Sequence, residues 1–278
     1  MRNLSVTKLV IVLTFSFNLT ACSSFSVFEK QDGAPNRHVD VNKINSAVPK
    51  TEPLCKYGNP SSYTVNGNYY RTLKSSKGYE ETGIASWYGT KFHNVLTSCR
   101  EPYDMYKMTA AHTTLPLPTY VKVTNLENGK QIIVRVNDRG PFEKNRLIDL
   151  SYVAAKKLGI LAKGTGLVRV TAIDPNTPKK ISTKTIKISP QKRPKIYLQV
   201  GAFKNLQNAN ALASKINNSI TAASCRVYSG HDSNKQLIYR VQVGPITKVN
   251  TADKITEQLE NSFKGAKPHA VVNLGGSA

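Results

Sequence analysis

The sequence has few of the residues from which metal and redox sites are built. It contains no CxxC and no HExxH stretch, and its five histidines are scattered along the chain: His38, His93, His112, His231 and His269. We therefore expect no metal site and no cofactor. Acidic residues are also scarce, 17 against 39 lysines and arginines, which gives a formal net charge of +22 at pH 7. Such a charge favours an anionic partner.

The N-terminus lacks an apolar run long enough to span a bilayer. Residues 1–22 read MRNLSVTKLVIVLTFSFNLTAC, a positively charged start, a short apolar core at 9–17, and small residues before Cys22. This order is typical of a secretory signal. The ending resembles the bacterial lipobox, which implies a signal peptide over 1–21 and lipid on the sulfur of Cys22. By the same resemblance, Ser23 directs the lipoprotein to the outer membrane, where acyl chains anchor it in the bilayer.

An exported chain folds in an oxidising compartment, where cysteines can form disulfides. The compartment also limits which anionic partners the chain meets. Three cysteines remain after processing, Cys55, Cys99 and Cys225, so at least one thiol lacks an intramolecular partner. Cys55 and Cys99 can pair, but the sequence does not decide it. Export also excludes nucleic acid as the anionic partner, and a cell-wall polymer or a membrane surface fits the compartment better.

Two segments of low apolar content divide the chain. Residues 22–55 show little periodicity and predict a tether. The stretch PNTPKKISTKTIKISPQKRPK at 175–195 has four prolines, seven basic residues and no acidic one, so we expect an extended linker over 175–194. Two folded units are then predicted, 56–174 and 195–274.

The second unit contains an internal sequence repeat. LQVGAF at 198–203 matches VQVGPI at 241–246, and each strand pattern is followed by a helical pattern and a further strand candidate. Two βα-β repeats predict a small α+β domain with an antiparallel sheet and helices on one face.

These two strands resemble the signature strands of the SPOR domain. The resemblance implies binding of peptidoglycan glycan strands that lack stem peptides, on the face of the sheet. The strand residues expected to bind are Gln199, Tyr239, Arg240 and Gln242. For each of them the alternative is a side chain that only completes a solvated sheet face.

The first unit is predicted to be mainly β. GIASWYG at 83–89 indicates a strand entering a turn, and residues 120–136 predict two strands joined around Asn128-Gly129. SYVAAKKLG at 151–159 predicts a short helix closed by glycine, and residues 166–173 a last strand. Short strands, one helix and many turns favour a small closed barrel.

The segments GIASWYG, EPYDMYKMTAAHTTLPLPTYVKVTN, RVNDRGPF and RLIDLSYVAAKKLG together resemble the rare lipoprotein A (RlpA) family. The resemblance implies a double-psi β-barrel that acts as a lytic transglycosylase, a polysaccharide lyase of peptidoglycan at the division septum, where septal-ring proteins are potential partners. Family members without activity still bind glycan. The alternative is therefore a non-catalytic glycan-binding lipoprotein of the septal ring.

Lytic transglycosylation cleaves the MurNAc–GlcNAc bond without water. An acid protonates the leaving oxygen, positive charge develops at the anomeric carbon, and the C6 hydroxyl of the same MurNAc attacks to give a 1,6-anhydro end. Because the attack is intramolecular, no enzyme nucleophile is required. One acid that later serves as base is sufficient, with a carboxylate to stabilise the charge.

By resemblance, Glu101, His112 and Asp138 match the active-site positions of the family. Asp138 in VNDRGPF is expected at a strand end, where Arg139 would favour its ionised form; the alternative is a turn salt bridge. Glu101 is the candidate general acid, with a solvated loop carboxylate as the alternative. His112 is expected to orient a carboxylate or relay a proton, unless it is a structural histidine.

Other residues are assigned to the surroundings of the site. Trp87 and Tyr88 are expected to stack on sugar faces, with barrel core as the alternative. Arg139 and Asp104 are candidate substrate-binding residues, although Asp104, like Asp149, has the character of a capping or pairing residue.

One position departs from the family pattern. Members commonly carry a small residue and then glycine before the glutamate, whereas this chain has Cys99-Arg100-Glu101. If residue 100 adopts a positive φ, arginine there costs roughly 1–2 kcal/mol. Arg100 would also favour the ionised form of Glu101, which opposes a role as general acid.

Overall fold

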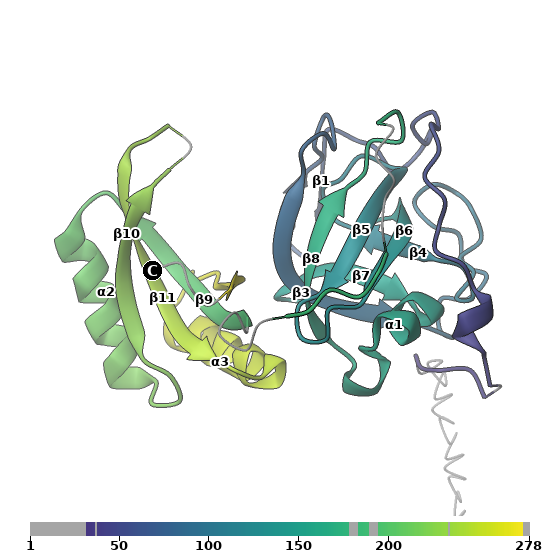
Figure 1. Ribbon diagram of the computed structural model, residues 1–278. Helices are drawn as coiled ribbons and strands as arrows, with labels where there is room; N and C mark the ends of the chain where they lie inside the picture. The colour runs from purple at the N-terminus through teal and green to yellow at the C-terminus, as the bar shows by residue number, and fades with distance from the viewer. Residues whose placement is uncertain (1–31, 37, 178–182, 189–193, 233, 275–278) are drawn as a thin grey trace, which may run out of the picture. The chain divides into compact units, whose positions relative to one another are not determined.

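The computed structural model describes residues 32–36, 38–177, 183–188, 194–232 and 234–274 (Figure 1). The predicted signal peptide 1–21 and Cys22 lie outside these residues. The described residues form two folded parts, which are taken in turn below. Within them, no helix has both the length and the apolar character needed to cross a bilayer.

The N-terminal part is a closed barrel, as predicted. Its strands are β3 (Glu80–Tyr88), β4 (Thr109–His112), β5 (Thr119–Asn125), β6 (Gln131–Asp138), β7 (Arg146–Ser151) and β8 (Gly166–Ala172). They close in the order β3-β7-β4-β6-β5-β8, with parallel pairs β3–β7 and β4–β6 and antiparallel pairs elsewhere. The helix α1 (Tyr152–Leu158) and the short η2 (Leu161–Lys163) follow β7.

The local chemistry of the chain accounts for the turns of the barrel. β5 and β6 form the predicted antiparallel hairpin, and Gly129 takes a φ of 73° that a side chain would strain. The helix α1 begins where the Ser151 hydroxyl accepts a hydrogen bond from the backbone of Ala154, and it ends at Gly159 with a φ of 81°. The predicted helix and its glycine cap are thus confirmed.

The segment before the barrel differs from the extended tether predicted over 22–55. The short η1 (Val41–Lys43) begins within it, and the backbone of Ala47 donates to the Ile133 carbonyl at 3.0 Å. Further on, the backbone of Cys55 donates to the Leu117 carbonyl at 2.8 Å. The backbone of this segment therefore contacts the barrel at Ala47 and at Cys55. A separate hairpin of β1 (Ser62–Val65) and β2 (Asn68–Arg71) follows.

The predicted linker 175–194 is described at 175–177, 183–188 and 194. Residues 175–177 and 183–188 belong to no helix or strand.

The C-terminal part is the predicted antiparallel sheet with two helices. Its strands β9 (Pro194–Phe203), β10 (Cys225–His231), β11 (Leu237–Ile246) and β12 (His269–Leu274) lie in the order β10-β11-β9-β12. The helices are α2 (Leu206–Ser219) and α3 (Val249–Ser262). Ala209, Ala213 and Ile216 of α2 and Ala252, Ile255 and Leu259 of α3 are buried in the core, whereas Leu206, predicted to share the α2 face, is exposed.

Candidate active site

A β-bulge shapes the end of β6 where Asp138 lies. Along the β4–β6 pair, Ala110 is opposite Val136, but the next residue, Ala111, is opposite Asp138, so Asn137 is an extra residue. A bulge of this kind bends the strand and re-aims the side chains that follow it. Since Ala110 and Val136 are fully buried in the barrel core, Asp138 joins Ala111 on the other face of the strand pair.

The carboxylate of Asp138 is held by the loop that precedes β4. Its Oδ1 accepts hydrogen bonds from the Ser98 backbone and hydroxyl, both at 2.7 Å, and from the backbone of Arg139 at 2.8 Å. Donors on one oxygen stabilise negative charge there. Because Asp138 is only half-buried, this fixed carboxylate remains accessible to a bound molecule.

Glu101 is held by the same loop and by the outer face of β6. Its carboxylate accepts hydrogen bonds from Arg135 at 2.8 Å and from the Asn137 side chain at 3.0 Å. Burial raises the pKa of Glu101, but these two hydrogen bonds outweigh it and the pKa lies below its usual value. Glu101 is therefore ionised at neutral pH, with 43% of its side chain exposed.

Sequence reasoning missed the second carboxylate on Arg135. Glu52, in the segment predicted as a tether, accepts hydrogen bonds from Arg135 Nε at 3.1 Å and Nη2 at 2.9 Å. Arg135 thus joins Glu52 to Glu101. No local pattern marks Glu52, because its partner lies 83 residues along the chain.

His112 is fully buried, and both of its ring nitrogens are occupied. Nδ1 accepts hydrogen bonds from the backbone of Thr114 and Leu115, both at 3.1 Å, so the proton is on Nε2, which lies 2.9 Å from the Tyr79 hydroxyl. Burial, aided by the charge of Arg139, lowers the pKa of His112 to about 3. The imidazole is therefore neutral at physiological pH.

The Arg139 guanidinium points away from Asp138. It donates to the carbonyl oxygens of Gly58 at 2.8 Å, His112 at 3.0 Å and Leu115 at 2.6 Å, and also to the Asn59 side chain. The turn salt bridge, the alternative interpretation of Asp138, is therefore not what Arg139 forms. Its guanidinium instead joins the lead-in segment to the turn after β4.

A second carboxyl group lies on the face that carries Asp138. In the strand pairing, Ala111 is opposite both Asp138 on β6 and Asp149 on β7, and Asp149 is opposite Ser86 on β3. The Ser86 hydroxyl donates to Asp149 Oδ1. Burial raises the pKa of Asp149 to about 6 despite this hydrogen bond. Asp149, predicted to be structural, thus differs from Glu52 and Glu101, in which burial raises the pKa but the hydrogen bonds to Arg135 outweigh it and lower the pKa.

The aromatic candidates lie close to these carboxyls, but Tyr88 is not free to stack on a sugar. Its ring is buried and stacked on Tyr103, with 4.1 Å between the ring centroids. Trp87 is half-buried with its ring edge against Tyr152, which leaves part of it exposed. Asp104 accepts a hydrogen bond from the backbone of Tyr106 at 2.9 Å, in the capping arrangement that its sequence context indicates.

The loop before Glu101 is tied down by the disulfide Cys55–Cys99. Cys225 remains free and buried, and burial raises its pKa to about 11. Arg100 has a φ of 64°, the left-handed conformation expected for a residue in the place of glycine. Its guanidinium lies 5.4 Å from the centroid of the Tyr57 ring. Arg135, and not Arg100, therefore pairs with Glu101.

The backbone at residue 100 can be tested with a matched pair of variants. Arg100→Gly and Arg100→Ala both remove the contact with Tyr57, but only alanine keeps the cost of a left-handed backbone. We expect the glycine variant to be the more stable by about 1 kcal/mol in urea unfolding, the reverse of the usual order. Equal stability, or a more stable alanine variant, would show that residue 100 is not left-handed.

In the C-terminal part, strand alternation separates the predicted glycan-binding residues. Gln199, Arg240 and Gln242 lie on the sheet face opposite the buried Leu198 and Val241. The two glutamines are paired across β9 and β11, with 3.4 Å between Nε2 and Oε1. By the same alternation, Tyr239 lies on the helix-covered face and packs against the core.

Two tyrosines on the open face were not singled out from the sequence. Tyr228 is opposite Arg240, and its ring meets that of Tyr197 edge to face at 6.3 Å. The signal that could have found them was the strand period, since Tyr197 is two residues from Gln199.

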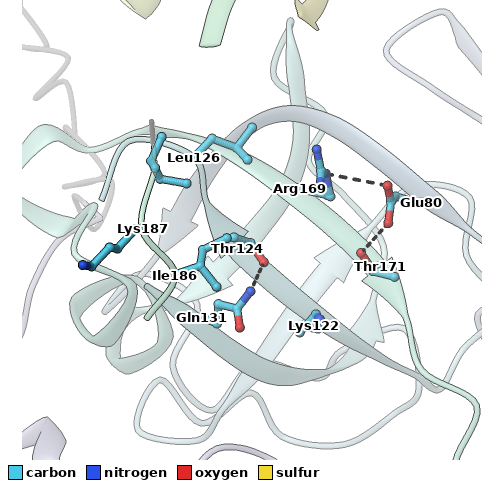
Figure 2. A pocket seen from close by; sticks show the side chains of 10 residues that line it. Glu80, Lys122, Thr124, Leu126, Gln131, Arg169, Thr171, Ile186 and Lys187 are labelled. Carbon is cyan, nitrogen blue, oxygen red and sulfur yellow. Dashed lines mark hydrogen bonds and ion pairs between the residues drawn. The ribbon is translucent and has the colours of Figure 1, made fainter. Parts of the chain in front are cut away.

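The outer wall of the barrel carries a separate pocket, shown in Figure 2. Side chains of β5, β6 and β8 line it, among them Lys122, Thr124, Gln131 and Arg169. Glu80 accepts a hydrogen bond from Thr171 at 3.1 Å and lies 3.7 Å from Arg169. None of the predicted site residues lines this pocket.

Comparison with known protein families matches both parts of the chain. Residues 80–172 match the family described as lytic transglycolase, and residues 192–271 match the SPOR domain. Among solved structures, the SPOR domain of RlpA from Pseudomonas aeruginosa is 32% identical over 27% of this chain and 96% of its own, with a TM-score of 0.25.

Full-length relatives agree with these matches. The endolytic peptidoglycan transglycosylase RlpA of Vibrio cholerae is 41% identical over 83% of this chain and 84% of its own. The protein of the same name from Pseudomonas aeruginosa is 40% identical over 88% of this chain and 83% of its own. The chain therefore belongs to the RlpA family of endolytic peptidoglycan transglycosylases.

Proposed function

We propose that this protein is an endolytic lytic transglycosylase that cleaves MurNAc–GlcNAc bonds in glycan strands lacking stem peptides, and leaves 1,6-anhydro-MurNAc ends. The observation that carries the proposal is the position of Asp138. Its carboxylate is fixed by Ser98 on a bulge of the barrel and still accessible, within the domain that matches the lytic transglycosylases. A fixed negative charge there stabilises the cation that develops at the anomeric carbon.

Glu101 and His112 support this centre in different ways. The pairing of Glu101 with Arg135 opposes the role of general acid, because that role needs a proton on the carboxyl. We assign to Glu101 the binding of substrate hydroxyl or amide groups as an ionised carboxylate. The neutral, buried His112 is a positioning residue: its backbone carbonyl and the turn built on its ring hold Arg139 in place.

Substrate delivery falls to the C-terminal sheet. Gln199, Arg240 and Gln242, with the tyrosines of the same face, suit a carbohydrate that needs hydrogen bonds and apolar ring contacts. Joining two weak glycan sites in one chain raises the effective concentration of each. With lipid on Cys22, the protein would act from the outer membrane on septal peptidoglycan, where septal-ring proteins are its potential partners.

The test is a digest of purified peptidoglycan with the chain from Ser23 onward, with and without prior removal of stem peptides by an amidase. Mass spectrometry of the released ends distinguishes the candidates. Anhydro ends from the denuded strands support the proposal, whereas reducing ends would make the protein a hydrolase. Binding without release would favour the non-catalytic alternative.

The open sheet face gives a separate prediction. Gln242→Ala removes a largely buried amide from this face, and we expect binding to denuded strands to weaken about tenfold, as for the loss of one or two hydrogen bonds. Sedimentation of the protein with amidase-treated peptidoglycan measures this. Lys215→Ala, on the exposed side of α2, is the matched control and should bind as the unmodified protein does. Unchanged binding by Gln242→Ala would remove this face from the glycan site.

A further inference from the structure

We propose that Asp149 is a second catalytic carboxyl group of the barrel and protonates the glycosidic oxygen, an inference that rests on the proposed function. Lytic transglycosylation needs a protonated acid as well as a charge stabiliser. The pairing of Glu101 with Arg135 leaves the first role without a residue. We assign the role of acid to Asp149 on β7, which is separated from β6, the strand of Asp138, by β4 alone.

The strand register brings the two carboxyls to one face. Asp138 and Asp149 flank Ala111 from opposite sides, on β6 and β7, so two strand spacings separate their Cα atoms, about 10 Å. The residue between them, Ala111, has only a methyl group and is itself buried. Without the bulge at Asn137, Asp138 would point to the core face.

The charges of both carboxyls act on the same buried phenol, that of Tyr88. Burial, Tyr103 and then the charges of Asp138 and Asp149 all raise the pKa of its phenol. The two carboxyls therefore approach Tyr88 closely enough for each charge to act on it. A sugar ring bound between β6 and β7 on this face would have one carboxyl on each side.

Asp149 has the protonation behaviour that an acid requires. Burial is the largest cause of its raised pKa of about 6, so about half of the Asp149 carboxyls carry a proton near pH 6 and about a tenth at pH 7. The residue as a whole is only partly buried. The groups that act on its charge are Ser86 and Arg146, which lower its pKa, and Asp32 and Glu143, which raise it.

The proton and electron balance closes without a further reactant. Asp149 gives its proton to the glycosidic oxygen, and the C1–O bond breaks with its electron pair going to that oxygen. The negative charge of Asp138 stabilises the cation at C1. The C6 hydroxyl then forms the new C6–O–C1 bond and loses its proton to the Asp149 carboxylate, which restores the acid.

The experiment compares Asp149→Asn with the unmodified protein on two substrates. One is amidase-denuded glycan, whose leaving group needs a proton. The other is a GlcNAc–MurNAc disaccharide with a dinitrophenolate leaving group, which needs none. We expect Asp149→Asn to lose about a hundredfold or more on glycan and to lose much less on the aryl glycoside, where only the base for the C6 hydroxyl is missing. Glu127→Gln, an exposed carboxyl elsewhere on the barrel, is the control.

A second variant, Ser86→Ala, tests the assignment while the Asp149 carboxyl is kept. Ser86 donates to Asp149 and lowers its pKa, so Ser86→Ala should move the alkaline limb of the pH–rate profile to higher pH. The proposal would be overturned if Asp149→Asn cleaved glycan at the unmodified rate, or if its activity fell equally on both substrates. It would also be overturned if Ser86→Ala left the alkaline limb of the pH–rate profile in place. If the unmodified protein releases no anhydro ends, the proposed function itself fails.

Discussion

Replacement of Asp138 by asparagine is expected to reduce the release of anhydro ends by about 10³- to 10⁴-fold. The change keeps the shape of the side chain and removes its charge. Oδ1 accepts hydrogen bonds from Ser98 and from the backbone of Arg139, and the asparagine oxygen can accept the same bonds. The loop therefore stays in place, while the cation at the anomeric carbon loses its stabilising charge, an effect of several kcal/mol.

The measurement is the initial rate of anhydro-end release from denuded strands, together with the binding of the same strands. Asp138→Asn should still bind, because the C-terminal sheet is unchanged, and should unfold at nearly the same urea concentration. Glu127→Gln is the matched control, another carboxyl replaced by its amide. An Asp138→Asn protein with more than a tenth of the unmodified rate would remove Asp138 from the catalytic centre.

The largest loss of stability is expected from removing the disulfide. Cys55 and Cys99 are 44 residues apart, and closing a loop of that size stabilises a folded chain by about 4 kcal/mol in the chain-entropy account. The double variant Cys55→Ser/Cys99→Ser should lose about this amount of unfolding free energy. Activity should fall as well, because the neighbouring Ser98 holds the Asp138 carboxylate and Glu101 on the same loop is itself a carboxylate of the site.

The comparison protein is Cys225→Ala, which removes the free buried thiol and leaves the closed loop intact. Urea unfolding of all three proteins, with and without dithiothreitol, separates the effects. Reductant should bring the unmodified protein to the stability of the double variant and leave the double variant unchanged. If reductant has no effect on the unmodified protein, the Cys55–Cys99 bond does not support this fold.

The parts of the fold that depend on local chemistry could be predicted from the sequence. Asn128-Gly129 fixed the β5–β6 hairpin because glycine takes its positive φ without strain. Gly159 marked the end of α1, and the repeat at 198–203 and 241–246 marked two of the strands, β9 and β11. Each of these signals lies within a few residues of the feature that it predicts.

The parts of the candidate site that were missed depend on contacts between distant segments. Glu52 meets Arg135 across 83 residues, and the carbonyl groups bound by Arg139 come from two loops. Asp149 reads as an ordinary strand residue, because only the bulge at Asn137 brings Asp138 to its face. Tyr88 likewise could not be told from an exposed aromatic until its stacking on Tyr103 was known.

In the proposed reaction, the C6 hydroxyl of the cleaved MurNAc attacks the anomeric carbon of the same sugar, and water takes no part. The most direct measurement is digestion of denuded strands in water labelled with heavy oxygen, followed by mass spectrometry of the new ends. We expect anhydro ends that carry no label and that are absent from the Asp138→Asn digest. New reducing ends that carry heavy oxygen would contradict it, because water would then be the nucleophile.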